Sequence, residues 1–251
     1  SKIVPVCIEV RGVKVKVKEM PIPVLYGAAF EGERVRRADV AVEMGSKYST
    51  AFEFLTSKES SEVEDGKIEV IGPEIDDIEE GGASPFGLLV EVYGRKMQKD
   101  YESILERQIH RFINGAMGVM HIAQRDMIWI RINKEAKKAG FKFRHLGEIV
   151  RAMLLEEYGA IVDKIQVTIY TNLEDVERIL PLARKSYNYR DERVAGMTDE
   201  SVDTLYSCTL CQSFAPNHVC IISPERLGLC GAYNWLDGKA NYEINPTGPN
   251  Q

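Results

Sequence analysis

Four cysteines near the carboxyl end of the chain have the residue type and spacing of a metal-binding set. Cys208, Cys211, Cys220 and Cys230 follow the pattern C-x2-C-x8-C-x9-C, whereas the preceding two hundred residues contain only Cys7. Thiolates bind soft and borderline metals strongly, and a two-residue spacing lets two sulfurs reach one metal ion or two corners of a cluster. The cysteine pattern therefore predicts a metal site.

The spacing leaves the identity of the metal open. A structural zinc ribbon usually supplies a second close C-x2-C pair, whereas Cys220 and Cys230 are single cysteines. The iron corners of a 4Fe-4S cubane lie several ångströms apart, so ligands from separate loops suit an iron-sulfur cluster. The spacing favours iron-sulfur over zinc, with unligated thiols as a third alternative. His218 could bind zinc, but with four cysteines present we expect it to form a hydrogen bond near the site.

Size and composition exclude several classes of protein. The chain has 251 residues, of which 44% are hydrophobic, so it can build one or two domains with cores and needs no disulfide framework. Its net charge of −6 argues against a broad nucleic-acid-binding surface. No apolar run approaches the roughly 18 residues of a membrane-spanning helix, and the first residues lack the features of a signal peptide. We therefore expect a cytoplasmic protein that binds neither nucleic acid nor membranes.

Alternating strands and helices must position the cysteines. Hydrophobic periodicity predicts strands at 13–18, 68–71, 88–93, 127–132 and 164–170, and helices at 100–113 and 146–158, with a short helix opening at Asn133. A further helix, which Thr171 or Asn172 can cap, is predicted to meet Pro181 and can resume with a kink toward Tyr189. This order predicts an α/β (mixed α+β) fold, in which a mixed sheet covered by helices is followed by a smaller metal-binding segment.

A domain boundary is predicted near the charged stretch at 189–193 and the glycine that follows it. It divides the chain into an α/β domain of residues 1–195 and a metal-binding part of residues 196–251. Thr198 or Asp199 is expected to cap a helix that leads directly into Cys208.

The sequence around the cysteines is specific. Residues 208–220 read CTLCQSFAPNHVC and lead into SPERLGLCGA at 223–232. Upstream segments that match the same family in the same order are PIPV at 21–24, AFEGE at 29–33, VIGP at 70–73, YGRKMQ at 93–98, HIAQRD at 121–126 and QVTIYT at 166–171. Over nearly its whole length the chain resembles the acetyl-CoA synthase family, the beta subunit of the carbon monoxide dehydrogenase and acetyl-CoA synthase complex of anaerobic bacteria and archaea.

The resemblance implies an acyltransferase of the Wood-Ljungdahl pathway, which joins CO, a methyl group and coenzyme A into acetyl-CoA at a nickel-iron-sulfur cluster. It implies that Cys208, Cys211, Cys220 and Cys230 are the ligands of a 4Fe-4S cluster, and that the sulfur of Cys211 also bridges to the proximal nickel. Phe214 resembles the aromatic residue that crowds this nickel, with an ordinary core phenylalanine as the alternative. The implied partners are a CO dehydrogenase subunit, a corrinoid iron-sulfur protein that donates the methyl group, and ferredoxin.

One departure from the family pattern concerns nickel. The family holds its two nickels with a later Cys-Gly-Cys segment, whose thiolates and backbone amides form a square-planar site that suits Ni(II). Here Cys230 is followed by Gly231 and Ala232, and the sequence ends at Gln251 before any such segment. We therefore expect the chain alone to carry the iron-sulfur ligands with an incomplete nickel site, and to make no acetyl-CoA.

Several basic residues are candidates for binding the phosphates of coenzyme A, because guanidinium groups pair well with phosphate. They are Arg34, Arg36, Arg37, Arg125 and Arg131, with Trp129 close in sequence. The resemblance likewise implies that this domain helps to bind coenzyme A. An ordinary surface role is the alternative, since the chain has no glycine-rich phosphate loop. A second hypothesis for the whole chain is a non-catalytic module, in which the cysteines hold a structural zinc or an electron-transfer cluster.

Overall fold

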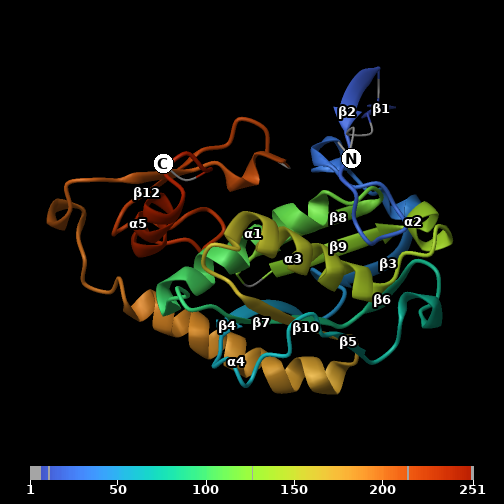
Figure 1. The fold of residues 1–251 in the computed structure, drawn as a ribbon, viewed down its shortest axis with the longest axis horizontal. Helices are drawn as coiled ribbons and strands as arrows, with labels where there is room; N and C mark the ends of the chain where they lie inside the picture. Colours follow the sequence, from blue (N-terminus) through green and yellow to red (C-terminus); the bar gives the residue numbers. More distant parts are fainter. Residues whose placement is uncertain (1–6, 11, 126, 214, 250–251) are drawn as a thin grey trace.

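The computed structural model describes residues 7–10, 12–125, 127–213 and 215–249 (Figure 1). Its helices are α1 (Glu102–Asn114), α2 (Lys134–Lys138), α3 (Phe143–Tyr158), α4 (Leu173–Glu192) and α5 (Trp235–Ile244). Its strands are β1 (Cys7–Val10), β2 (Val13–Lys16), β3 (Val40–Gly45), β4 (Ala51–Ser57), β5 (Ile68–Ile71), β6 (Gly82–Ser84), β7 (Phe86–Tyr93), β8 (Val119–Gln124), β9 (Met127–Asn133), β10 (Lys164–Tyr170), β11 (Tyr206–Cys208) and β12 (Cys220–Ile222). The predicted mixed α/β class is confirmed.

One four-stranded sheet has the order β4-β7-β10-β5 and mixes parallel with antiparallel pairs. Its strands alternate their side chains between two helical layers. On β4, Phe52 and Phe54 pack with α4, whereas Leu55 belongs to the larger core that contains α1 and α3. Figure 1 shows α4 along the outer side of this sheet, with α1 and α3 on the opposite side.

A second mixed sheet has the order β6-β3-β9-β8, so the described chain contains two four-stranded sheets where the sequence predicts one. Hydrophobic periodicity does not predict β3, because every residue of this strand is buried and the alternation of polar and apolar positions is absent. Both sheets contribute to a single apolar core with α1 and α3. This shared core makes α1 a central element of the fold.

Most of the predicted elements that follow α1 are present. Strand β10 occupies the predicted residues, and α2 starts directly after Asn133, whose side chain accepts from the N–H of Ala136 at 2.7 Å. Helix α4 is capped by Asn172, which accepts from the N–H of Asp175 at 2.9 Å, and it continues as one helix through Pro181.

The prediction of a helix that leads into Cys208 is wrong. A capping box between Thr198 and Ser201 closes a single 3-10 turn, and the chain then becomes extended into β11. Two physical reasons favour the strand: Ser, Val, Asp and Thr at 201–204 are weak helix formers, and β11 gains backbone partners in β12.

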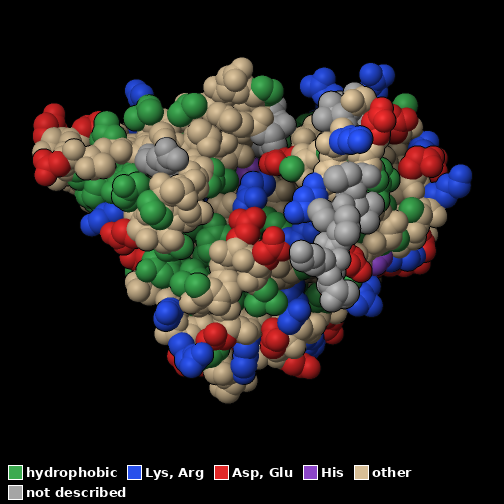
Figure 2. Space-filling model, turned by 45° about the horizontal axis from the view of Figure 1, so that its top comes forward, with side chains coloured by type: hydrophobic (Ala, Val, Ile, Leu, Met, Phe, Trp, Pro, Cys, Tyr) green, Lys and Arg blue, Asp and Glu red, His purple; other side chains and the backbone are tan. Residues whose placement is uncertain are grey.

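The surface is not uniform. Figure 2 shows hydrophobic side chains gathered on the side formed by the C-terminal segment, while Lys, Arg, Asp and Glu side chains are spread over the rest of this face. Exposed large hydrophobic residues of that segment include Leu205, Val219, Ile221, Leu227, Leu229 and Tyr242. Among the described helices, none has the length and apolar character needed to cross a bilayer.

Candidate metal centre

A short antiparallel hairpin and the loops beside it carry the four cysteines. Cys208 ends β11 and Cys220 begins β12, and the two are direct partners in the register of the hairpin. Cys211 lies in the 3-10 turn Leu210–Ser213. Cys230 lies in a tight turn in which the N–H of Gly231 donates to the carbonyl of Gly228 at 2.8 Å. All four are free thiols; Cys208 is buried and the other three are half-buried.

The buried guanidinium of Arg107, on α1, interacts with three of these thiols. Its Nη2 donates to the Sγ of Cys211 at 3.4 Å, and Cys208 and Cys230 lie within electrostatic reach. Burial alone would lower the pKa of Arg107, but the negative charge that the thiols acquire as thiolates outweighs burial and raises it. A second guanidinium nitrogen, Nη1, donates to the carbonyl of Ala123 at 2.9 Å, which fixes the group in place.

Arg107 belongs to a polar stripe on α1 formed by Ser103, Glu106, Arg107 and His110. These positions lie on one face of the helix, because residues three, four and seven apart are neighbours on a helix surface. Ser103 Oγ donates to the Oδ1 of Asp237 on α5 at 2.5 Å. His110 Nε2 lies 3.3 Å from the carbonyl oxygen of Leu210, beside Cys211. The stripe therefore fastens the cysteine-bearing segment to the α/β core.

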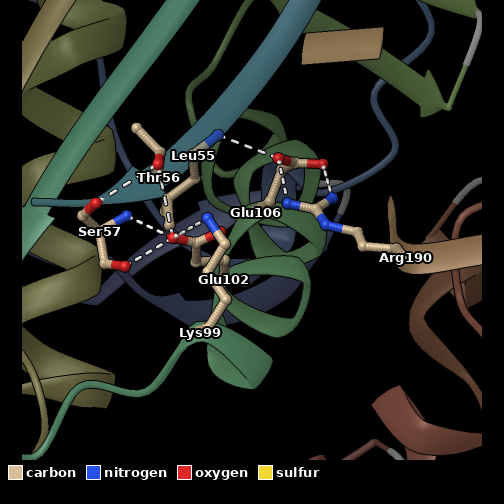
Figure 3. Close-up of polar contacts among 7 residues, drawn as sticks. All are labelled: Leu55, Thr56, Ser57, Lys99, Glu102, Glu106 and Arg190. Carbon is tan, nitrogen blue, oxygen red and sulfur yellow. Dashed lines mark hydrogen bonds and ion pairs between the residues drawn. The ribbon is translucent and has the colours of Figure 1, made fainter. Parts of the chain in front are cut away.

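Glu106 joins the same stripe to α4. Figure 3 shows its carboxylate forming a two-pronged pair with Arg190, with N–O distances of 2.8 Å and 3.1 Å. The backbone N–H of Leu55 on β4 also donates to Glu106, at 2.9 Å. The backbone carbonyl of Arg190 accepts from the side chain of Asn234, the N-cap of α5, at 3.1 Å. Helices α1, α4 and α5 therefore meet at this buried ion pair.

Hydrogen-bond donors also reach Cys220. The backbone N–H of Leu229 donates to its Sγ at 3.4 Å, and the Nε2 of His218 lies 3.1 Å from the same sulfur. The predicted hydrogen bond of His218 near the site is thereby confirmed. N–H groups directed at cysteine sulfurs are a common way of stabilising a metal-bound thiolate.

Burial favours the protonated form of two of the thiols, Cys208 and Cys211, in the absence of metal. Burial raises the pKa of Cys208 to about 12, although a backbone hydrogen bond from Leu210 and the charge of Arg107 oppose it. Burial also raises the pKa of Cys211, again against Arg107. Metal binding must therefore displace protons from these sulfurs.

The donor set fits an iron-sulfur cluster in type and charge. Four sulfur donors, N–H groups directed at three of them and a buried cation suit a thiolate-ligated cluster with net negative charge. Across the described ranges, no group of three or more His, Cys, Asp and Glu side chains is arranged to hold a metal ion. Three of the thiols instead interact with one guanidinium.

Three of the residues considered for coenzyme A meet at one buried carboxylate, that of Glu43. Trp129 Nε1 donates to its Oε1 at 2.6 Å, Arg131 Nε donates to the same oxygen at 3.2 Å, and Arg37 pairs with its Oε2. The guanidinium of Arg131 also stacks on the ring of Trp129, 4.7 Å from its centroid. Glu43 is fully buried, and these ion pairs and the indole hydrogen bond compensate its carboxylate.

The other candidates lie elsewhere. Arg34 and Arg36 are exposed. Arg125 forms a two-pronged ion pair with Asp191 on α4, and its backbone N–H donates to the carbonyl of Cys230 at 3.2 Å. The structure therefore does not bring the six residues together. Phe214 lies outside the described residues.

A hollow of about 420 Å³ lies beside Arg125. Its lining includes three cationic side chains, Lys47, Arg125 and Arg184, and the hydroxyl-bearing residues Ser46 and Thr50. Every residue described as lining it is neutral or basic. The hollow therefore has the charge of a site for an anionic group.

Sequence reasoning missed Arg107 and His110. The available signal was their position inside the predicted helix at 100–113, where they lie between the apolar residues Leu105, Ile109 and Phe112. A charged residue on the apolar side of a helix needs a partner, which marks it for attention.

Comparison with known proteins gives concordant matches for both parts of the chain. Residues 22–176 match the family model described as CO dehydrogenase/acetyl-CoA synthase complex beta subunit. Residues 187–251 match the model that describes the C-terminal part of the ACS/CODH beta subunit.

Relatives extend over most or all of the chain. It is 54% identical over 251 residues to the carbon monoxide dehydrogenase/acetyl-CoA synthase subunit alpha of Moorella thermoacetica, covering 100% of this chain and 34% of that protein. It is 45% identical over 228 residues to the acetyl-CoA decarbonylase/synthase complex subunit beta of Methanopyrus kandleri, covering 91% of this chain and 49% of that protein. The chain thus spans between a third and a half of the length of these relatives.

Proposed function

The chain belongs to the CO dehydrogenase/acetyl-CoA synthase complex beta-subunit family, and we propose that it carries the iron-sulfur ligands of an acetyl-CoA synthase active site. Cys208, Cys211, Cys220 and Cys230 are proposed to bind one 4Fe-4S cluster. The observation that carries this proposal is the convergence of three of these thiols on the guanidinium of Arg107, a cation suited to an anionic cluster.

The complete enzyme is proposed to be an acyltransferase that condenses CO, a methyl group and coenzyme A into acetyl-CoA. The bound cluster would support nickel, the metal at which carbon-carbon bond formation takes place, through the thiolate of Cys211. Cys211 is half-buried, in contrast to the buried Cys208. Phe214, three residues on, is proposed to limit access to small gases. The remaining cysteine, Cys7, lies in β1, so these 251 residues alone are proposed to leave the nickel site incomplete and acetyl transfer unsupported.

Coenzyme A is proposed to place its phosphates at the hollow beside Arg125. This hollow combines hydroxyl groups with Lys47, Arg184 and Arg125, of which Arg125 is also paired with Asp191. The backbone N–H of Arg125 also binds the carbonyl of Cys230, which connects the hollow with the cysteine segment. Arg34, Arg36, Arg37, Arg131 and Trp129 remain candidates outside this hollow; Arg37 and Arg131 pair with Glu43, and Trp129 donates a hydrogen bond to it.

The wider setting follows from the family. We propose a CO dehydrogenase subunit, a corrinoid iron-sulfur protein and ferredoxin as partners, and an anaerobic cytoplasm as the location. The chain is proposed to divide into residues 1–195, an α/β domain, and residues 196–251, the start of the iron-sulfur and nickel domain.

Anaerobic metal analysis of the reconstituted chain tests the proposal. We expect roughly four irons and four acid-labile sulfides per chain. Cys208→Ala and Cys220→Ala variants should lose most of this iron, whereas Cys7→Ala should retain it. One zinc without sulfide would contradict the cluster and support the alternative, a zinc-binding interaction module, in which the contact between His218 and Cys220 would supply a mixed nitrogen and sulfur ligand set.

A further inference from the structure

We propose that Arg107 is the fixed counter-charge of the cluster, and that it sets the cluster's reduction potential and holds the sulfur of Cys211 in place. This inference rests on the proposed iron-sulfur function of the four cysteines. It concerns a positioning residue on α1, about a hundred residues before the cysteines, which the cysteine motif does not contain.

The first argument is that Arg107 is buried without a carboxylate partner among the described residues. Arg107 is 7% exposed, and burying a cation is costly unless a negative group compensates it. Its neighbour Glu106 is already paired with Arg190. Within the described ranges, no carboxylate lies within ion-pair distance of Arg107, whereas Arg190, which is also buried, has one. Among the described residues, the negative charge that acts on Arg107 comes from Cys208, Cys211 and Cys230.

The second argument is that the guanidinium cannot turn away from the sulfurs. Its Nη1 donates to the carbonyl of Ala123 at 2.9 Å and lies 3.1 Å from the Nδ1 of His110. Its Nη2 is left directed at Cys211, 3.4 Å from the Sγ. A guanidinium whose Nη1 is held by both a strand carbonyl and a side chain of its own helix is preorganised to bind a thiolate through Nη2.

The third argument is that one strand end supports both sides of the site. The carbonyl of Ala123 holds Arg107, and two residues later the N–H of Arg125 donates to the carbonyl of Cys230 at 3.2 Å. The distance between the guanidinium and the cysteine loop is thus fixed by β8 and the turn that follows it. The position of the charge is a property of the fold rather than of a mobile side chain.

The consequence is a directional effect on redox chemistry. Reducing a thiolate-ligated cluster adds negative charge, and a nearby cation and N–H···S hydrogen bond stabilise the reduced form. Removing Arg107 should therefore make the cluster harder to reduce. Lysine retains the charge without the two-pronged geometry, so it should restore part of the effect.

The test uses the full chain reconstituted anaerobically, with Arg107→Met, Arg107→Gln and Arg107→Lys variants. At the potential where the unmodified chain is half reduced, we expect the ratio of reduced to oxidised cluster in Arg107→Met to fall at least tenfold, as measured by EPR during redox titration. This fall corresponds to about 59 mV for one electron. Arg107→Gln, which keeps an N–H donor without the charge, carries the test if the methionine variant does not fold.

The control variant is Arg111→Met, one turn further along α1, because Arg111 pairs with Glu157 on α3 and contacts none of the cysteines. It should leave the ratio unchanged. A ratio in the charge-removing variants within twofold of the unmodified chain, at full iron content, would overturn the role of Arg107 and leave the cluster assignment standing. A reconstituted unmodified chain without iron and sulfide would overturn both.

Discussion

Replacing Arg190 with methionine should destabilise the chain by about 3 kcal/mol, because it leaves the carboxylate of Glu106 buried without its cation. The side chains of Arg190 and Glu106 are only 6% and 12% exposed, so solvent screens the pair weakly. After the substitution, Glu106 would keep the N–H of Leu55 as a donor. That bond places the expected loss at the lower end of the roughly 3–5 kcal/mol seen for broken buried pairs.

The measurement is urea unfolding of the metal-free chain, followed by circular dichroism, for Arg190→Met, Glu106→Gln and the double variant. Because glutamine removes the buried charge, the double variant should be more stable than the sum of the two single losses predicts, with a coupling free energy of about 2 kcal/mol. Arg178→Met on the same helix is the matched control. Its pair with Asp175 is exposed, so the free energy of unfolding should change little.

Two results would refute this reasoning. A loss below about 1 kcal/mol for Arg190→Met would mean that water reaches Glu106 after all. Additive effects of the two substitutions would mean that the two side chains stabilise the fold independently, and not as the pair in Figure 3.

Three further outcomes are expected. Burial, reinforced by the charge of Arg107, holds the pKa of His110 well below its usual range. The free energy of unfolding should therefore be constant above about pH 6.5 and should decrease as the pH falls below that value. Urea midpoints at about pH 7.5 and 5.5 measure this decrease, which should be smaller in His110→Gln. Air oxidation of the metal-free chain should join Cys208 to Cys220, since directly opposed residues of antiparallel strands lie about 4.5–5.5 Å apart at Cα; peptide mapping that finds Cys211 linked to Cys230 would contradict this. Gly45→Ala should lower the free energy of unfolding by more than about 2 kcal/mol, because φ is 71° and the new Cβ would lie 1.8 Å from the carbonyl oxygen of Ile128. Gly140→Ala is the control: φ is 95° but the space around it is open, so thermal or urea unfolding should show a smaller loss.

Local sequence patterns predicted the elements whose chemistry is local. The alternation that precedes Lys18 and the choice of Thr171 or Asn172 as a cap depend on neighbouring residues, so the sequence alone predicted β2 and placed the start of α4 to within one residue. The sequence did not predict strand β3, because the uniform burial of this strand comes from neighbours far away in the chain. The sequence did not predict the strand that ends at Cys208 for the same reason, since this strand depends on pairing with the strand that begins at Cys220.

The candidate site divides in the same way. The four cysteines are recognisable from spacing and context. Arg107 and Glu106 are not, because their partners lie 104 and 84 positions further along the sequence. A helix pattern shows that two charged residues lie among apolar ones, but only the tertiary structure shows which segment they bind.

The polar stripe of α1 also bears on when the site can form during synthesis. Ser103 and Asp237 are 134 positions apart, and Arg107 and Cys211 are 104 apart, so these two contacts of α1 cannot form until the cysteine segment and α5 have been made. Contacts between distant residues form after local ones, because the intervening chain must first be closed into a loop. We therefore expect the cysteine hairpin to dock last, onto an α/β core that has already folded. Cofactor insertion would then depend on synthesis of the segment through α5 as well as on the supply of iron.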